Sequence, residues 1–276
     1  MLKSLHETIH PTALIAQGAV IGAGVKIGPF CTVGAQVVLE EGVELVSHVV
    51  VDGRTRIGAG AKLFPFCTVG LAPQDLKYKG EDTETVIGPR TQIREHCSIH
   101  RGTVTGTGVT RIGADCLLMA VVHIAHDCDV GDGVIMSNNV VLGGHVEVGD
   151  RAIIGGSAAL LQFVRVGTGA MIGGVTGVTA DVTPYCFVFG PRARMVGLNI
   201  IGLRRRGLSK PQLHNIRAAH RFIFSGPGVF AERLAMARTE FGAEPCIAEM
   251  LDFMATPSRH GLITTLARAT GEDEEG

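Results

Sequence analysis

The sequence predicts an all-β domain, a parallel β-helix, followed by a small α-helical domain. Aliphatic residues or Met recur at every sixth position and open 26 hexads, and the fifth position of these hexads is Ala, Val, Cys or Thr wherever the register holds. Past Pro184 the apolar residues recur at helical spacing instead. We therefore assign the β-helix to residues 1–190 and the helical domain to residues 191–276.

The aliphatic column determines how the coils stack. It begins at Ile9, keeps its register to Val69, resumes at Ile87, and runs again from Ile112 to Val178. In a parallel β-helix such residues point inward and stack on their equivalents in coils about 4.8 Å away. Three hexads make a coil of 18 residues, so 26 hexads give about eight to nine coils.

Small residues and glycine account for the corners of each coil. The fifth position fits a corner too narrow for Leu or Phe, and thirteen hexads place Gly directly after the opening residue, where we expect it to tolerate the turn backbone. Five of the seven Cys fall in the small-residue column, and we expect them to be buried fillers rather than disulfides or metal ligands. These are Cys31, Cys67, Cys97, Cys116 and Cys128.

Two excursions interrupt the hexads, near residues 70–86 and 102–111. The first keeps the hexad register, because Val69 and Ile87 are 18 residues apart, whereas Ile99 and Ile112 are 13 apart. Excursions from a regular scaffold commonly carry function. We expect this above all of the first one, which is polar and rich in Lys and Asp.

The composition excludes several classes of protein. A formal net charge of −1 argues against a general nucleic-acid binder. No apolar run approaches the roughly 18 residues of a membrane span, so we expect no integral membrane segment. The first seven residues lack the apolar core of a signal peptide, and together with the Cys usage this predicts a cytoplasmic protein.

The C-terminal part predicts three helices. Ser209 can cap a helix that has Pro211 in its first turn and ends at Ser225-Gly226, and two more helices fit Val229 to Phe241 and Glu244 to Ala255. We expect these helices to cover the open edge of the last coil, and the acidic run Glu272–Glu275 to be frayed.

Histidines converge on one patch of the predicted β-helix. With 18 residues per coil, Gly144 stacks one coil above His126, Gln162 stacks above Gly144, and His145 stacks above Asp127; His123 lies close by in the sequence. An imidazole beside a carboxylate can act as a general base. A free Gly N–H nearby can stabilise an oxyanion.

Several strings resemble the UDP-N-acetylglucosamine O-acyltransferases that begin lipid A biosynthesis, a family of hexapeptide-repeat proteins. The resemblance runs from His10 to about Ile263, and it is most specific in the first and third of the strings that follow. The strings are Gln74-Asp75-Leu76-Lys77-Tyr78, Ile99-His100-Arg101-Gly102-Thr103-Val104, His123-Ile124-Ala125-His126-Asp127-Cys128, Ile153-Ile154-Gly155-Gly156, Asn199-Ile200 and Arg205-Arg206-Gly207.

The resemblance implies a left-handed β-helix that forms a homotrimer with sites between subunits. It also implies transfer of a 3-hydroxyacyl chain from acyl carrier protein to the sugar 3-hydroxyl, with no cofactor beyond the carrier's phosphopantetheine. His126 would be the base, oriented by Asp127, with the N–H of Gly144 as oxyanion donor. Residues that match contacts to sugar, phosphate, nucleotide or carrier are Gln74, Asp75, Lys77, His123, His145, Gly156, Gln162, Asn199, Arg205 and Arg206.

The acyl chain would lie along Met171, Gly174 and Arg192. Gly173-Gly174 leaves the groove open for a long chain, while Arg192 occupies another length-setting position. The basic run Arg204-Arg205-Arg206 would face the acidic acyl carrier protein. Its alternative is an ordinary solvated stretch.

Other functions stay open. The chain has Leu161 where the family commonly has His, and Ile201 where it commonly has Glu, which raises the alternative of a 3-amino sugar acceptor. A transferase that uses acetyl-CoA is a second alternative. The sibling N-acyltransferase is disfavoured, because its extra N-terminal domain has no room before Ile9. A zinc hydratase of the carbonic anhydrase type could draw ligands from His96, His100, His123, His126 and His145, although we expect no metal.

Overall fold

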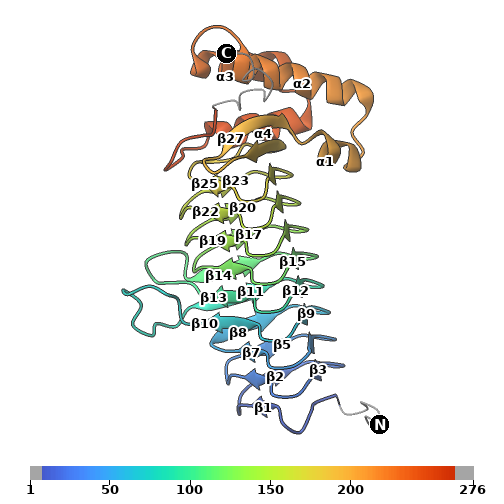
Figure 1. Ribbon diagram of the computed structural model, residues 1–276, viewed down its shortest axis with the longest axis vertical. Helices are drawn as coiled ribbons and strands as arrows, with labels where there is room; N and C mark the ends of the chain where they lie inside the picture. Colours follow the sequence, from blue (N-terminus) through green and yellow to red (C-terminus); the bar gives the residue numbers. More distant parts are fainter. Residues whose placement is uncertain (1–7, 265–276) are drawn as a thin grey trace, which may run out of the picture.

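Most hexads fold into two-residue strands whose second residue is the opener, and this residue is buried in all but the first coil. The computed structural model describes residues 8–264, and its strands stack into three long parallel sheets that form the walls of a β-helix (Figure 1). Openers such as Leu142 and Ile154 are completely buried, whereas the residue before each opener faces outward. The parallel β-helix predicted from the six-residue period is confirmed.

We call the three sheets I, II and III. Sheet I contains β1 (Leu14–Ile15), β4 (Thr32–Val33), β7 (Val50–Val51), β10 (Thr68–Leu71), β13 (Ser98–His100), β16 (His123–Ile124), β19 (Val141–Leu142), β22 (Ala159–Leu160) and β25 (Gly177–Val178). Sheet II contains β2 (Val20–Ile21), β5 (Val38–Leu39), β8 (Arg54–Ile57), β11 (Glu84–Ile87), β14 (Val109–Ile112), β17 (Asp129–Val130), β20 (Glu147–Val148) and β23 (Arg165–Val166). Sheet III contains β3 (Lys26–Ile27), β6 (Glu44–Leu45), β9 (Lys62–Leu63), β12 (Gln92–Ile93), β15 (Leu117–Leu118), β18 (Ile135–Met136), β21 (Ile153–Ile154), β24 (Met171–Ile172), β26 (Cys186–Phe189) and β27 (Arg194–Leu198).

The sheets meet at three corners, where the chain turns from one strand to the next. Corner A joins sheets I and II, corner B joins II and III, and corner C joins III and I. The fourth residue of the hexad lies at the corner and adopts the left-handed conformation, with φ of 58° at Asp127 and 61° at His145 on corner A and 55° at Val175 on corner C. Most L-residues resist this conformation, so the stacked coils hold it in place.

Glycine at the second position of a hexad has a different role from the one we expected. Gly22 and Gly28 do not have positive φ; instead, a Cβ on Gly22 would lie 2.7 Å from the backbone of Glu40 in the next coil, and one on Gly28 would overlap the carbonyl of Val46. The expectation that these residues serve the turn backbone was therefore wrong. They allow one coil to approach the next closely.

Both excursions loop out of the coil. Ile87 pairs with Ile57, 30 residues earlier, so twelve residues beyond the 18 of a coil leave the wall between β10 and β11. Ile112 pairs with Ile87, 25 residues earlier, so seven extra residues project between β13 and β14. Both loops leave the β-helix on the same side (Figure 1).

The C-terminal region caps the last coil with helices and a hairpin. The helices are α1 (Ile200–Arg205), α2 (Lys210–Ser225), α3 (Phe230–Phe241) and α4 (Pro245–Ala255). The predicted cap at Ser209 is present, since its side chain accepts from the N–H of Gln212 while the Gln212 side chain accepts from the N–H of Ser209. Our prediction missed α1 and the antiparallel pairing of β26 with β27.

The boundary that we expected after residue 190 falls between β26 and β27, so the change from β-helix to helical region runs through a paired hairpin. The run Glu272–Glu275 lies outside the described residues. Within residues 8–264, no helix is long and apolar enough to cross a membrane. All seven Cys are free, and the five of the small-residue column are buried as expected.

Candidate active site

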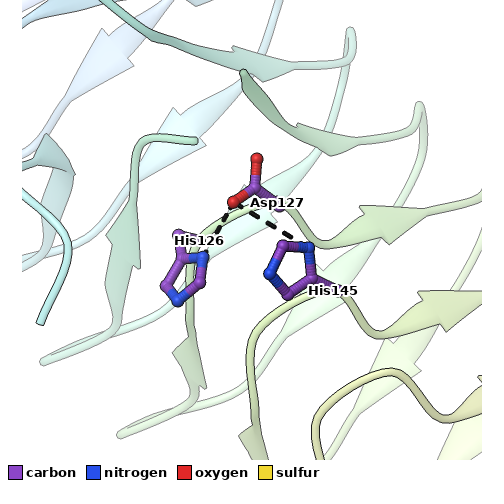
Figure 2. Close-up of side chains that lie close together, drawn as sticks. All are labelled: His126, Asp127 and His145. Atoms are coloured by element: carbon purple, nitrogen blue, oxygen red, sulfur yellow. Dashed lines mark hydrogen bonds and ion pairs between the residues drawn. The ribbon is translucent and has the colours of Figure 1, made fainter. Parts of the chain in front are cut away.

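His126 and Asp127 form a hydrogen-bonded pair on corner A, immediately after β16. The His126 Nδ1 lies 2.8 Å from the Asp127 Oδ2, and the carboxylate is completely buried while the imidazole is 18% exposed (Figure 2). An ionised carboxylate only accepts hydrogen bonds, so His126 carries its proton on Nδ1. The Nε2 atom, at the opposite edge of the ring, is therefore the position that can accept a proton.

The second excursion surrounds the Asp127 carboxylate with donors. The Thr103 hydroxyl donates to Oδ2 over 2.6 Å, the Thr103 N–H lies 3.1 Å from both oxygens, and the Gly108 N–H donates to Oδ1 over 3.1 Å. Burial by itself raises the pKa of Asp127, but hydrogen bonds from Thr103 and His126 outweigh it and hold the pKa below its ordinary value. Asp127 is therefore ionised at neutral pH.

His145 completes the cluster from the next coil. Its Nδ1 lies 4.0 Å from the Asp127 Oδ2, and its ring stacks on Phe163, with centroids 4.3 Å apart and planes 3° from parallel. The guanidinium of Arg259 lies 3.8 Å above the other face of this stack, over Phe163. Burial lowers the pKa of His145, and Arg259 acts in the same direction against the attraction of Asp127.

Gly144 lies one coil above His126, as predicted from the 18-residue period. A Cβ on Gly144 would lie 2.7 Å from the His126 Cε1 and 2.9 Å from its Nε2, so the imidazole occupies the space of the missing side chain. Among residues 8–264 the Gly144 N–H has no acceptor. Gln162, one coil further, is exposed, and its carbonyl lies 2.9 Å from the His260 Nε2.

His123 belongs to a neighbouring group on sheet I. Its Nδ1 lies 2.7 Å from the Ser98 Oγ, and its ring meets that of His100 edge-on at 5.0 Å. Burial lowers the pKa of His123. Burial, with the nearby His123 and His126, lowers the pKa of His100 to about 4. Both rings are therefore neutral at pH 7.

The first excursion brings its polar side chains beside the second. Asp75 and Lys77 line a narrow crevice together with Thr103 and Thr105. The Asp75 carboxylate accepts from the backbone N–H of Lys77 over 3.0 Å, and Lys77 itself is exposed. Gln74 is exposed next to them.

Other predicted site residues lie on other corners of the same chain. Gly156 and Gly174 stack on corner C, where a Cβ on Gly174 would lie 3.2 Å from the Gly156 carbonyl oxygen. Met171 is half-buried in β24, and Arg192 is exposed between β26 and β27. A single chain therefore does not bring these residues next to His126.

Asn199 and the basic run lie at the top of the β-helix. The Asn199 side chain is buried, accepts from the Gly202 N–H over 2.9 Å and donates to the Gly169 carbonyl over 3.1 Å, so it caps α1 and ties it to corner B. Arg206 packs over the Tyr185 ring at 5.0 Å. Arg205 is exposed.

Sequence reasoning missed Thr103, Phe163 and Arg259 as parts of the cluster. The density of Thr and Gly in residues 102–108 was a signal for the first, because Asp127 needs donors and the loop offers hydroxyls and free amides. No sequence pattern indicated that Arg259 belongs to the cluster, because it lies 114 residues beyond His145 in the sequence.

A metal site must be tested against this geometry. In the described part of the chain, His126, Asp127 and His145 are the one group whose ligand atoms lie within 4.8 Å of one another. However, the Nδ1 atoms of both rings face the carboxylate, and its oxygens already accept from Thr103 and Gly108. His96 lies away from the cluster, stacked on Phe66 at corner C. The donor set suits proton transfer rather than zinc binding.

A hexapeptide β-helix that holds a His–Asp pair on one corner defines a hexapeptide-repeat transferase, and residues 18–53 and 109–144 match the bacterial transferase hexapeptide repeat. Residues 181–263 match the second domain of UDP-N-acetylglucosamine O-acyltransferase. The chain belongs to the UDP-N-acetylglucosamine O-acyltransferase family.

The similarity extends over nearly the whole chain. The acyl-[acyl-carrier-protein]–UDP-N-acetylglucosamine O-acyltransferase of Azorhizobium caulinodans is 50% identical over 254 residues, which cover 92% of this chain and 94% of that protein. The solved structure of the Moraxella catarrhalis UDP-N-acetylglucosamine O-acyltransferase matches with a TM-score of 0.90 and 41% identity, covering 93% of this chain and 100% of that one. The UDP-N-acetylglucosamine acyltransferase of Francisella novicida matches with a TM-score of 0.90 and 32% identity, covering 97% of this chain and 100% of that one.

Proposed function

We propose that this protein transfers a 3-hydroxyacyl chain from acyl carrier protein to the 3-hydroxyl of UDP-N-acetylglucosamine, the first step of lipid A biosynthesis. The observation that carries the proposal is the His126 imidazole, which a buried carboxylate orients through Nδ1 so that Nε2 lies at the opposite edge of the ring, free to accept a proton. The name of the Azorhizobium caulinodans relative, which is 50% identical over 254 residues, supports the same donor and acceptor.

The reaction follows from these groups. The His126 Nε2 takes the proton of the sugar hydroxyl while the oxygen attacks the thioester carbonyl carbon of the donor. The carbonyl oxygen becomes an oxyanion, which accepts a hydrogen bond from the free N–H of Gly144. As the C–O double bond re-forms, the C–S bond breaks. The imidazolium then returns its proton to the thiolate of the carrier, and Asp127 stabilises the imidazolium in between.

The remaining polar groups near corner A are proposed substrate contacts. Lys77 offers a free ammonium to a phosphate, and Asp75 and Gln74 lie beside it for sugar hydroxyls. His123 and His145 are neutral and can donate or accept hydrogen bonds without adding charge. Gln162 continues the same corner one coil above Gly144.

We propose a homotrimer as the active form. The outward-facing residues of sheet I include no charged side chain, whereas sheet II exposes Arg56, Arg111, Asp129 and Glu147 at the same positions. The outward residues of sheet I are Leu14, Thr32, Val50, Thr68, Ser98, His123, Val141, Ala159 and Gly177. An uncharged face beside the His–Asp pair is suited to burial against another copy.

Such an assembly would also unite the scattered site residues. Corner C of one subunit could approach corner A of its neighbour, so that Gly156 and the groove at Gly174 and Met171 receive the nucleotide and the acyl chain. Arg192 would then limit the length of that chain. The exposed Arg205 and its neighbour Arg206 lie on the cap, where they would meet the acidic carrier, with Asn199 holding α1 in place. We also propose a cytoplasmic location, which the seven free thiols favour.

One experiment tests the proposed reaction. The purified protein is offered UDP-N-acetylglucosamine or its 3-amino analogue, with 3-hydroxyacyl carrier proteins of increasing length or with acetyl-CoA, and the products are identified by mass spectrometry. The proposal predicts an ester of UDP-N-acetylglucosamine formed from the acyl carrier protein. A faster reaction of the 3-amino analogue would instead tie the exposed Leu161 and Ile201 to a changed acceptor. A preference for acetyl-CoA would refute the proposal that acyl carrier protein is the acyl donor.

A further inference from the structure

The second excursion has a role that follows from its contacts with Asp127. We propose that Thr103 is a positioning residue for the acyl transfer proposed above, and that its hydroxyl and N–H hold the Asp127 carboxylate in the orientation that serves His126. We call residues Gly102–Gly108, which carry these donors, the carboxylate cradle. This inference rests on the proposed function.

The cradle satisfies both oxygens of a carboxylate that has no contact with solvent. Oδ2 accepts from the Thr103 hydroxyl over 2.6 Å and from the His126 Nδ1 over 2.8 Å. Oδ1 accepts from the Gly108 N–H over 3.1 Å, and the Thr107 Oγ1 lies 3.2 Å away. A short hydrogen bond to an ionised acceptor is among the strongest that a hydroxyl makes. The Thr103 hydroxyl therefore contributes more than any other donor of the cradle to holding the Asp127 carboxylate.

The cradle also leaves the carboxylate no second orientation. A Cβ on Gly106 would overlap the Asp127 carboxyl group, so the loop backbone lies directly against it. From β14, the Thr110 Oγ1 accepts the Asp127 N–H over 2.8 Å and so fixes the backbone of this left-handed residue. The residue is therefore held at both ends by the excursion and the strand that follows it.

Replacing Thr103 by Val separates the effect of its hydroxyl on the Asp127 carboxylate from the effect of its packing. Valine has nearly the same volume and keeps the backbone N–H, but it removes the 2.6 Å hydrogen bond to a site that stays buried. Because fewer hydrogen-bond donors then stabilise the ionised carboxylate against the effect of burial, the pKa of Asp127 rises. The titratable groups that face Asp127 are His126 at 2.8 Å and His145 at 4.0 Å, and none of the substitutions below replaces either residue.

The test compares Thr103→Val with Thr103→Ser, which restores the hydroxyl. Thr85→Val serves as the matched control, because the buried Thr85 hydroxyl has no partner. We expect Thr103→Val to lower kcat about 10- to 100-fold with little change in KM, and to raise the carboxyl titration point of Asp127, measured by ¹³C NMR with Asp127→Asn for assignment. Thr103→Ser should restore both values, and Thr85→Val should leave both unchanged.

A second variant approaches the carboxylate from an exposed position. Gly106→Ala pushes a methyl group against Asp127 and should lower kcat in the same way, whether or not Thr103→Val folds well. Unchanged kcat and unchanged Asp127 titration in either variant would overturn the inference. Failure of the wild-type protein to acylate UDP-N-acetylglucosamine would refute the proposed function instead, while the NMR titration would still decide whether the cradle controls Asp127.

Discussion

The imidazole of His126 lies over Gly144 of the next coil, in the space that a side chain at that position would need. A Cβ there would stand 2.7 Å from the ring, closer than non-bonded atoms approach. The glycine therefore allows the ring to sit beside a free backbone N–H.

Gly144→Ala should lower activity without unfolding the protein. The added methyl group displaces the His126 ring from the Gly144 N–H, and a misplacement of about 1 Å can cost roughly 100-fold in kcat. Because Gly144 does not have positive φ, alanine adds no backbone strain. Steady-state kinetics together with thermal melting check this, and a variant with wild-type kcat would show that the ring position is not critical.

Val141→Arg should break the proposed homotrimer. Val141 is 43% exposed on the uncharged face of sheet I, and a charge there would have to be buried in the assembly. Light scattering should give three times the chain mass of 29.0 kDa for the wild type and a smaller mass for the variant, with acyl transfer lost in parallel.

The matched control for this substitution is Val20→Arg. Val20 is 56% exposed on sheet II, whose outer face already carries several charges, so the same change should leave mass and activity unaltered. Equal masses for wild type and both variants would contradict the assignment of sheet I as the interface.

Stability should fall with acid because of His100. Burial lowers its pKa to about 4 in the folded chain, whereas the unfolded residue titrates near about 6.5. The unfolded chain therefore takes up this proton first, and the stability that His100 contributes is complete above pH ~6.5 and is lost as the pH falls toward the folded value. Between pH 7 and 5 the loss from this residue is about 2 kcal/mol.

His100→Phe should flatten that dependence. The buried His100 Nδ1 has no partner, so a phenyl ring replaces it without breaking a hydrogen bond in the described structure. Urea unfolding at pH 7 and pH 5 gives the two free energies. An identical pH dependence in the wild type and the variant would show that His100 titrates normally in the folded chain.

The repeat made the scaffold predictable from the sequence. Because each coil has 18 residues and each opener points into the interior, the residues 18 and 36 positions after Ile124, Leu142 and Leu160, stack in the same column. The stacking of Gly144 over His126 followed from the same step. The cap at Ser209 was visible because its partner Gln212 lies three residues away.

The features that were missed depend on contacts the period does not encode. The role of Gly22 is set by the backbone of the next coil rather than by its own dihedral angles. The cradle around Asp127 comes from a loop 24 residues earlier, where the register breaks. Arg259 reaches Phe163 only because the chain returns from α4 to the β-helix, and no local pattern specifies that return.

The proton transfer by His126 is the central claim, and its most direct test is the rate of acyl transfer in His126→Ala. With saturating 3-hydroxyacyl carrier protein and UDP-N-acetylglucosamine, removal of the base should lower kcat by about 100- to 10,000-fold, with the thermal melting curve and the assembled mass unchanged. A variant that keeps wild-type kcat would contradict the assignment of His126 as the general base.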